Sequence, residues 1–356
     1  MKHYNICIIG AGASGCAAAI TAAKDNKSVC ILEKNKEVLR KVAATGNGKC
    51  NISNTNCENV REVVDFFETI GIYFAEEDEG RLYPYNRSAS TVVEVMADEM
   101  KALGVEVYTE TEVKEIKKGF VISTSEGRFE ADKLLIAAGG KSGPQFGTTG
   151  DGYIFARKLG HKVSTLIPSL TAIECEGDFK KLKGIRALAK VTLRKDGKDI
   201  AQERGEVQFT EDGLSGICIF NLSRFLKIEK GEDFKKGIRR FTVSIDFLPE
   251  MDDEKASEVI RKLGLTSLLK KPLTAVVSEN NIKDFEVTVT GVKGWKQSQV
   301  TAGGVSLDEI DMDTMESKVV PGLYFAGEVI DYDGPCGGYN LTNAWITGIK
   351  AGKAML

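Results

Sequence analysis

Histidine is nearly absent from this chain of 356 residues, which contains only His3 and His161. Histidine is the usual general acid or base near neutral pH and a common metal ligand. With only two histidines in the chain, a Ser-His-Asp triad and a multi-histidine metal site are disfavoured. We therefore predict no bound metal and expect other groups to carry the chemistry.

The cysteines also lack the spacing of a metal site, since no two of them form a C-x-x-C pair. This pattern disfavours both a zinc site and the disulfide framework of a secreted domain. We expect most of the thiols to be reduced core residues. The eight cysteines are Cys7, Cys16, Cys30, Cys50, Cys57, Cys175, Cys218 and Cys336.

Long apolar runs and a strong excess of one charge are missing as well. No stretch of about 18 apolar residues occurs, and the apolar run 6–9 is far shorter than a signal-peptide core. The formal net charge is -3, so electrostatics favour neither nucleic acid nor an anionic membrane as a partner. We predict a cytoplasmic protein that acts on a small molecule, with its oligomeric state left open.

Glycine, in contrast, forms a motif at the start of the chain. The segment NICIIGAGASGCAAAITAAKDNKSVCILEK, residues 5–34, places Gly10, Gly12 and Gly15 at the spacing G-x-G-x-x-G. The motif lies between a predicted strand, 4–9, and a predicted helix, 13–23. A second strand, 28–32, ends at Glu33, and the segment therefore predicts a complete βαβ unit for a nucleotide.

Each residue of this motif has a physical task in the predicted unit. Gly10 permits a tight turn, Gly12 lets the backbone approach a pyrophosphate, and Gly15 allows the helix to pack closely on the strand. The helix N-terminus offers free N–H groups to the phosphates, and Glu33 can accept hydrogen bonds from ribose hydroxyls. An acid at position 33 disfavours a nucleotide with a 2′-phosphate, but the motif alone does not separate NAD from FAD.

The C-terminal segment favours FAD. Residues 320–355 predict a strand over 323–326, a Gly327-Glu328 turn, a glycine-rich loop and a helix that begins near Gly338. In flavoproteins with two dinucleotide-binding domains, an acid after such a strand bonds the ribityl chain, and the next helix points its N-terminus at the flavin. The partial positive charge of that helix stabilises the reduced ring, whereas NAD needs no such helix.

Six further motifs are spread over nearly the whole chain. They are RKVAATGNGKCNISN (40–54), EDEGRLYP (77–84), LLIAAGGKSGPQFGTTGDGY (134–153), GEVQFTEDGLSG (205–216), QVTAGGVSLDEID (299–311) and GLYFAGEVIDYDGPCGGYNLTNAWITG (322–348). Together they resemble the bacterial NAD(P)/FAD-dependent oxidoreductases called BaiN/RdsA-like or aminoacetone-oxidase-like. The resemblance implies non-covalent FAD, with NAD(P)H as a candidate reductant. This chain is somewhat shorter than expected for that family, and Cys336 stands where the family more often has threonine.

The predicted cofactor contacts come from several separate stretches of the sequence. The loop 45–51 follows the ribose acid, where flavin and phosphate contacts fall in such flavoproteins, although its composition also fits an ordinary surface loop. Arg40 fits either a phosphate contact or a solvated charge. The predicted cofactor-binding residues are Gly10, Gly12, Ala13, Ser14, Gly15, Glu33, Lys34, Arg40, Thr45, Gly46, Asn47, Gly48, Cys50, Asn51, Ala138, Gly139, Gly140, Gly303, Gly304, Gly327, Glu328, Gly337, Gly338, Tyr339 and Asn340.

Three residues are candidates for catalysis: Arg81, Tyr83 and Cys336. Arginine and tyrosine can polarise a substrate carbonyl near the flavin, or they can decorate an exposed turn. The motif assignments place Cys50 and Cys336 in loops near the flavin. Two unrelated small residues are favoured there over a redox-active pair, because nothing in the sequence brings their Cα atoms within the roughly 7 Å that a disulfide requires.

The middle of the chain predicts a different kind of structure. Residues 1–163 and 296–356 are predicted to form a discontinuous, three-layer, Rossmann-like α/β domain that binds FAD. Residues 164–295 are predicted to be an inserted β-rich domain with a short helical segment. The insertion lacks a second G-x-G-x-x-G motif, so we interpret it as a substrate or cap domain, and NAD(P)H would dock directly at the flavin.

Local patterns add finer predictions. In the first domain we expect a helix over 91–103 with a Thr91/Glu94 capping box and a hairpin over 105–130. In the insertion, the Asp196-Gly197 pair predicts a hairpin turn, and the charged amphipathic pattern over 252–263 predicts a helix.

The favoured function is that of an FAD-dependent oxidoreductase transferring hydride to or from a small organic substrate. One alternative is a non-catalytic flavoprotein that senses redox state. Another is an FAD-dependent enzyme that modifies nucleic acid, although no basic stripe with interleaved aromatic residues is evident.

Overall fold

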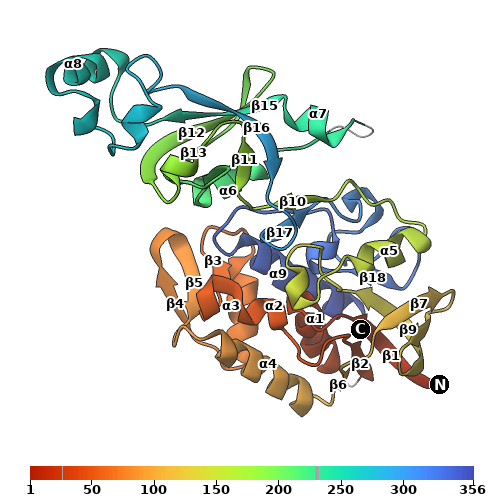
Figure 1. Cartoon of the computed structure of the whole chain (residues 1–356). Helices are drawn as coiled ribbons and strands as arrows, with labels where there is room; N and C mark the ends of the chain where they lie inside the picture. The colour runs from red at the N-terminus through yellow and green to blue at the C-terminus, as the bar shows by residue number, and fades with distance from the viewer. Residues whose placement is uncertain (26, 229–231) are drawn as a thin grey trace. The chain divides into compact units, whose positions relative to one another are not determined.

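The structure is a computed structural model that describes residues 1–25, 27–228 and 232–356. It contains two compact units, Met1–Ile167 together with Val300–Leu356, and Pro168–Gln299 (Figure 1). Each unit has its own buried core of apolar side chains, which is the property expected of a domain.

A mainly parallel sheet forms the centre of the first unit. Its strands are β1 (Lys2–Ile9), β2 (Val29–Leu32), β6 (Glu106–Tyr108), β7 (Val113–Lys117), β8 (Val121–Thr124), β9 (Gly127–Ile136) and β18 (Leu323–Phe325). β1 lies between β2 and β9, and the long β9 pairs with β8 near its start and in parallel with β18 near its end. This sheet, with the helices of the same unit, confirms the predicted Rossmann-like α/β fold.

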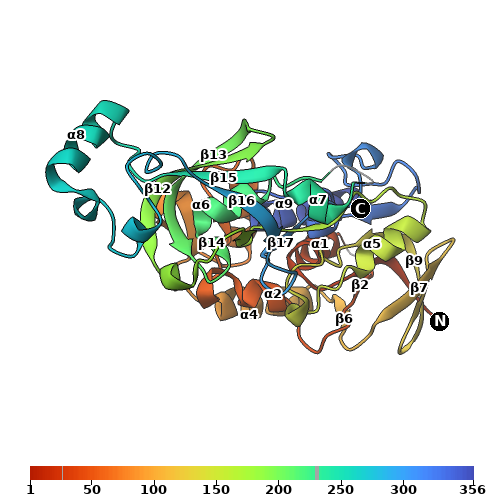
Figure 2. The same ribbon diagram turned by 45° about the horizontal axis from the view of Figure 1, so that its top comes forward.

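The opening segment forms the predicted βαβ unit. Between β1 and β2 runs α1 (Ala13–Ala23), which is rich in alanine and almost entirely buried. It packs against the C-terminal helix α9 (Tyr339–Ala354) (Figures 1 and 2). A Cβ atom added at Gly348 would overlap the backbone of Ser14, and one at Gly352 would lie 2.7 Å from the Ala18 carbonyl oxygen. The two helices therefore approach closely because small residues face each other.

The other elements of the first unit lie around this sheet. They are α2 (Arg40–Ala43), β3 (Ser53–Asn54), α3 (Val60–Thr69), β4 (Phe74–Glu77), β5 (Arg81–Pro84), α4 (Ala89–Ala102), α5 (Asp151–Lys158) and β17 (Val300–Ala302). β3, β5 and β4 form a small antiparallel sheet, which carries two of the predicted catalytic residues.

Two local predictions in this unit are wrong. Helix α4 begins after Ser88, and no side chain caps it. Thr91 therefore lies inside the helix, where its hydroxyl accepts a hydrogen bond of 2.7 Å from the side chain of Asn86. The single hairpin expected over 105–130 is instead β6, which joins β2 in parallel, followed by the antiparallel strands β7, β8 and β9. Alternation of side chains indicates strands but does not identify their partners.

The second unit is a closed antiparallel barrel. Its strands are β11 (Ile173–Cys175), β12 (Arg186–Lys195), β13 (Lys198–Phe209), β14 (Gly213–Ser215), β15 (Phe241–Asp246) and β16 (Phe285–Val292), in the order β11-β14-β13-β12-β15-β16. The barrel closes because β16 pairs with β11. The sequence predicts a β-rich segment, and the structure confirms it. The closure depends on a pairing between strands more than 100 residues apart.

Local signals in this unit are confirmed. Lys195 pairs with Lys198 across a two-residue turn in which Asp196 and Gly197 have positive φ angles of 51° and 76°, as a tight hairpin turn requires. The helices are α6 (Ile217–Ser223), α7 (Phe234–Ile238) and α8 (Asp253–Leu263). In both views α8 lies away from the barrel strands of its own unit (Figures 1 and 2). The strand β10 (Ile167–Ser169) lies where the chain passes from the first unit into the second.

Candidate active site

Four strand ends of the central sheet lie in one row. Ile9 pairs with Leu32 and with Ile136, and Ile136 pairs in turn with Phe325. Because these strands are parallel, the loops that follow them leave the same edge of the sheet. The glycine motif, Glu33, the Ala138–Gly140 turn and the Gly327-Glu328 turn are thereby brought together.

The three glycines of the opening motif have different surroundings. A Cβ atom at Gly10 would lie 2.5 Å from the Ala137 carbonyl oxygen, and one at Gly15 would overlap the Gly10 carbonyl oxygen. No described atom lies within 4 Å of a Cβ atom at Gly12. Gly10 and Gly15 are therefore required by the protein itself, whereas the space beside Gly12, at the start of α1, is open to a ligand.

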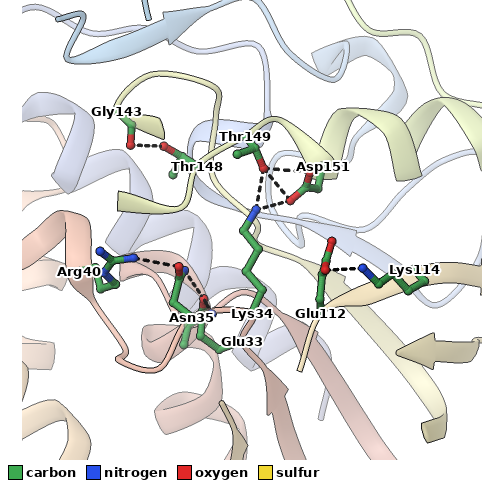
Figure 3. Close-up of polar contacts among 11 residues, drawn as sticks. Glu33, Lys34, Asn35, Arg40, Glu112, Lys114, Gly143, Thr148, Thr149 and Asp151 are labelled. Atoms are coloured by element: carbon green, nitrogen blue, oxygen red, sulfur yellow. Dashed lines mark hydrogen bonds and ion pairs between the residues drawn. The ribbon is translucent and has the colours of Figure 1, made fainter. Parts of the chain in front are cut away.

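Glu33 is buried and both its carboxylate oxygens are engaged. Oε2 accepts a hydrogen bond of 2.8 Å from the backbone of Ala11, inside the glycine motif. Oε1 accepts hydrogen bonds from the backbone and the side chain of Asn35, at 2.8 and 2.6 Å. The Asn35 oxygen accepts a bond of 2.9 Å from Arg40 (Figure 3). A chain of polar contacts thus connects three predicted cofactor segments.

Lys34 follows the acid but points in another direction. Figure 3 shows its side chain running toward Thr149 and Asp151, away from the Glu33–Asn35 contacts. Its ammonium group donates a hydrogen bond of 2.6 Å to the Thr149 hydroxyl and forms an ion pair with Asp151. In this structure, the Lys34 charge is compensated at the start of α5.

Glu328 is the acid predicted to bind the ribityl chain, and it lies at the centre of a second polar cluster. Its Oε2 forms an ion pair of 2.6 Å with Lys41, and its Oε1 accepts a hydrogen bond of 2.9 Å from the backbone of Thr301. A Cβ atom at Gly140 would lie 2.5 Å from the Thr301 hydroxyl and would also overlap the Glu328 carboxylate. Glycine at 140 therefore makes room for a contact within the protein.

Several other predicted residues also make contacts within the first unit. The Ser14 hydroxyl is buried and donates to the Ala326 carbonyl at 3.2 Å. Cβ atoms at Gly303 and Gly327 would overlap Thr165 and Ser14 respectively, and one at Gly304 would approach the backbone of Ile330. Gly139 has a φ angle of 72°. These glycines allow loops to pack against one another at the sheet edge.

The predicted flavin loop has an unusual backbone. Gly46, Asn47, Gly48 and Cys50 all have positive φ angles, between 54° and 83°. Its residues 46–49 are exposed, while Cys50 is fully buried. Successive residues in such a turn conformation can present their backbone N–H groups to an anionic or electron-rich ligand.

Asn51 carries an unusual polar atom. Its Oδ1 is buried and has no hydrogen-bond partner among the described residues. A Cβ atom at Gly338, the residue that precedes α9, would lie 3.1 Å from this oxygen and 2.6 Å from the Ser53 carbonyl. Buried acceptors are normally satisfied, and this unpaired one lies close to the residue that precedes α9.

Contacts at the start of α9 fix the neighbouring loop. The Asn340 side chain accepts from the backbone of Gly334 at 2.8 Å and donates to its carbonyl at 2.9 Å. Trp345 is fully buried and its indole N–H donates to the Ile52 carbonyl at 3.0 Å. Asn340 thus orders the loop before the helix, and Trp345 attaches the helix to the segment after the flavin loop.

Arg81 and Tyr83 project from the same face of β5, because side chains alternate along a strand. A Cβ atom added at Gly46 would lie 3.3 Å from the Tyr83 ring, and one added at Gly337 would lie 3.8 Å from the Arg81 Nε. Burial raises the pKa of the Tyr83 phenol, so this group stays protonated at neutral pH. Arg81 is ion-paired with Glu79.

The predicted cysteine candidates differ in exposure. Burial raises the pKa of the Cys50 thiol to about 12, which makes it an unreactive thiol at neutral pH. Cys336 is partly exposed in the loop before α9. All eight cysteines lie in the described ranges, and none of them forms a disulfide.

The sequence predicts no site role for Asn35, Asn54 or Thr301. The basic pair Arg40-Lys41 suits either the FAD phosphates or solvent, and the structure pairs Lys41 with Glu328. Thr301 lies in β17, outside the central sheet, and its backbone meets Glu328 only in the folded chain. No signal in the local sequence indicates such a contact between distant segments.

Comparison with known proteins assigns the chain to a family. A family model described as the HI0933-like protein Rossmann domain matches residues 4–63 and 59–354. A 3-dehydro-bile acid delta(4,6)-reductase from Clostridium scindens is 35% identical over 411 residues, which cover 98% of each chain. The chain belongs to the HI0933-like family. This HI0933-like protein is thus a flavoprotein oxidoreductase, and the resemblance predicted from its motifs is confirmed.

Other relatives have a different named substrate. Ribosomal RNA dihydrouridine synthases from Haemophilus influenzae and Escherichia coli are 29% and 28% identical, over 95% and 97% of this chain and 95% and 96% of theirs. The predicted exclusion of nucleic acid is therefore not supported. Within the described part of this HI0933-like chain, no helix has both the length and the apolar character needed to cross a bilayer.

Solved structures agree with the fold of the HI0933-like protein. A 3-ketosteroid-delta4-(5alpha)-dehydrogenase from Rhodococcus jostii RHA1 has a TM-score of 0.53 at 13% identity, covering 99% of this chain and 97% of that one. A flavocytochrome c3 fumarate reductase has a TM-score of 0.51 at 15% identity, covering 99% and 78%. At these identities the likeness concerns the fold alone.

Proposed function

We propose that this protein binds one FAD without a covalent bond and reduces a C=C bond conjugated to a carbonyl group in a small organic molecule. FAD would supply the hydride when bound. NAD(P)H is the proposed reductant, and it would dock directly at the flavin because the second unit is an antiparallel barrel without a dinucleotide motif.

The observation that carries the cofactor assignment is the open start of α1 at the sheet edge, where no described atom lies within 4 Å of a Cβ atom at Gly12. An extended dinucleotide can place its phosphates at such a helix start. FAD would fit there, with Glu33 binding the ribose and Glu328 the ribityl chain.

The proposed reaction class, reduction of a conjugated C=C bond, rests on the reactions that the names of two kinds of relative describe. A 3-dehydro-delta(4,6) steroid carries double bonds conjugated to a ketone, and dihydrouridine is the product of reducing a double bond conjugated to a carbonyl of uracil. Both products arise from hydride addition to the carbon β to a carbonyl, with a proton then added to the neighbouring carbon. The 35% identical relative acts on the small molecule, which makes that substrate class our first choice.

Arg81 is the proposed group for the carbonyl oxygen of the substrate. Hydride addition places negative charge on that oxygen, and a fixed cation stabilises such charge. Arg81 is less than one quarter exposed in its side chain and lies beside Gly337 at the start of α9. Tyr83 is buried and its ring lies against Gly46 of the predicted flavin loop, so we assign it to packing beside the loop.

We propose that the barrel unit, approximately residues 164–295, takes part in substrate recognition. The sequence of the insertion shows no second glycine motif, and its six barrel strands contain no parallel pair. An antiparallel barrel without that motif fits a cap or substrate domain better than an NADPH domain. Differences in substrate specificity between relatives would then arise in this unit.

RNA is the second candidate substrate, favoured by the two rRNA-modifying relatives. An anaerobic experiment separates the two proposals. The flavin of the holoprotein is reduced by photoreduction, then mixed with androst-4-ene-3,17-dione as a conjugated-ketone probe or with an unmodified rRNA transcript. Reoxidation by the ketone alone supports the first proposal and reoxidation by the transcript alone supports the second. Reoxidation by neither would contradict both, and a repeat with NADH and NADPH tests the reductant.

A further inference from the structure

Asn54 joins two parts of the candidate active site that are far apart in the sequence. It ends β3, pairs with Arg81 in the small sheet and is only 2% exposed. Its Nδ2 donates a hydrogen bond of 2.9 Å to the Gly337 carbonyl and one of 3.0 Å to the Glu79 carbonyl. One amide group therefore connects the loop before α9 with the turn before β5.

The orientation of this amide is fixed by its third contact. The Asn54 Oδ1 accepts a hydrogen bond of 2.9 Å from the backbone of Asn56. The reverse orientation would place the amide oxygen against two carbonyl oxygens and the NH₂ group against an N–H group. Both N–H donors and the oxygen acceptor of the Asn54 amide are thus used. No other side chain of this size supplies two donors and one acceptor in this arrangement.

The two carbonyls that Asn54 holds belong to segments that meet the proposed flavin. Gly337 precedes Gly338, the residue before α9. Glu79 has a φ angle of 61° and leads through Gly80 into Arg81. The left-handed conformation of Glu79 is uncommon for a residue with a side chain, so contacts around the turn are needed to hold it.

The geometry also places Arg81 beside the helix start. The Arg81 Nε would lie 3.8 Å from a Cβ atom at Gly337, and the Asn54 Nδ2 would lie 3.7 Å from the same point. A change at Asn54 would release the Gly337 loop and the Glu79 turn together. The distance between the Arg81 guanidinium and the first turn of α9 would then no longer be fixed.

We propose that Asn54 is a positioning residue that holds the Arg81 cation against the first turn of α9. The inference uses the proposed function for one point only, namely that FAD lies beside this helix start. Arg81 would touch the substrate oxygen, while Asn54 would act through Arg81 and through the backbone of Gly337.

Sulfite is a suitable probe, because it adds to oxidised flavins and the resulting anionic adduct is stabilised by positive charge near the ring. The experiment compares holoprotein variants Asn54→Ala, Arg81→Met, the double variant and the control Asn56→Ala. The Asn56 side chain donates a longer bond of 3.4 Å to the Glu79 carbonyl and makes no described contact with Gly337, and the backbone bond from Asn56 to Asn54 remains possible in the alanine variant. FAD content is measured for each variant, followed by the sulfite dissociation constant.

We expect the Asn54→Ala and Arg81→Met variants each to bind sulfite at least about tenfold more weakly while keeping FAD. The double variant is expected to be no weaker than the worse single variant, because the two residues act as a unit. Asn56→Ala is expected to bind sulfite like the wild type. If Asn54→Ala does not fold, Asn54→Ser keeps one donor and is expected to show a smaller loss of the same kind.

Wild-type sulfite affinity in a folded Asn54 variant would overturn the proposal, as would losses that simply multiply in the double variant. A variant that only melts at lower temperature would assign Asn54 a structural role. These outcomes are separate from the fate of the proposed function. If the expected sulfite pattern is found but the wild type reduces neither the ketone nor the transcript, the positioning role stands and the proposed reaction fails.

Discussion

The proposed adenosine side and the proposed flavin side of the candidate site, each named for the half of FAD that we expect it to bind, are built in different ways. The proposed adenosine side comes from one stretch, residues 10–35, in which Gly15 packs on Gly10 and Glu33 bonds the backbone of Ala11. The flavin side is assembled from three segments, 45–54, 81–83 and 337–340, joined by contacts such as Asn54 to Gly337. Local sequence therefore specifies the first side, whereas tertiary packing creates the second.

The largest effect expected on the adenosine side is a stability effect. Gly15→Val would force a branched side chain into the Gly10 carbonyl, and overpacking of this kind costs about 3 kcal/mol or more. We expect a large loss of stability in the apoprotein, measured by urea unfolding without FAD. Unfolding at the wild-type midpoint would show that α1 and β1 are farther apart than described.

Gly12→Val is the matched variant that separates binding from folding. Because the space beside Gly12 is open, we expect the apoprotein to keep its stability. The side chain would occupy the path of the pyrophosphate, and FAD affinity is expected to fall by at least about 100-fold. Calorimetric titration of the apoprotein with FAD measures this loss. Full FAD retention would mean that the glycine motif is only a turn.

On the proposed flavin side, Asn51→Leu is expected to stabilise the apoprotein. The change removes a buried oxygen that has no partner among the described residues, which relieves a desolvation penalty of about 1 kcal/mol or more. Thermal unfolding of the apoprotein tests this expectation. A lower melting temperature would show that the Asn51 oxygen is satisfied in the folded protein.

These contrasts also define how much the sequence could predict. The βαβ unit, the Asp196-Gly197 turn and the helix after Gly338 follow from local spacing and turn chemistry, and all are found. The Lys41–Glu328 pair and the Asn54 bridge join residues nearly 290 apart. Only the tertiary packing of these segments brings them together, and no local pattern contains that information.

Outside both sides of the site, His161 is expected to make stability depend on pH. Burial lowers the pKa of His161, whose Nε2 lies 2.7 Å from the Ser317 hydroxyl and whose Nδ1 has no partner among the described residues. Below the ordinary pKa of about 6.5 the unfolded chain takes up a proton that the folded chain resists, so stability falls as pH decreases. Unfolding midpoints at pH 7.5 and pH 5.5 measure the effect. His161→Gln is expected to reduce that difference, and an equal difference in the variant would assign it to other groups.

The smallest effect is expected for the cysteines. The Cys50 thiol stays protonated because burial raises its pKa to about 12, so reductive titration is expected to consume two electrons per FAD. Cys336→Thr is expected to leave that number unchanged. Consumption of four electrons by the wild type and two by the variant would establish a redox-active cysteine on the flavin side.

The most direct test of a two-sided site is the identity of the released flavin. The protein is purified, denatured by heat, and the flavin in the supernatant is separated and quantified against the chain. We predict one FAD per chain, because we expect the site to bind both the adenosine half and the flavin half of the dinucleotide. FMN as the released species would contradict the adenosine side, and flavin that stays with the precipitated chain would contradict non-covalent binding.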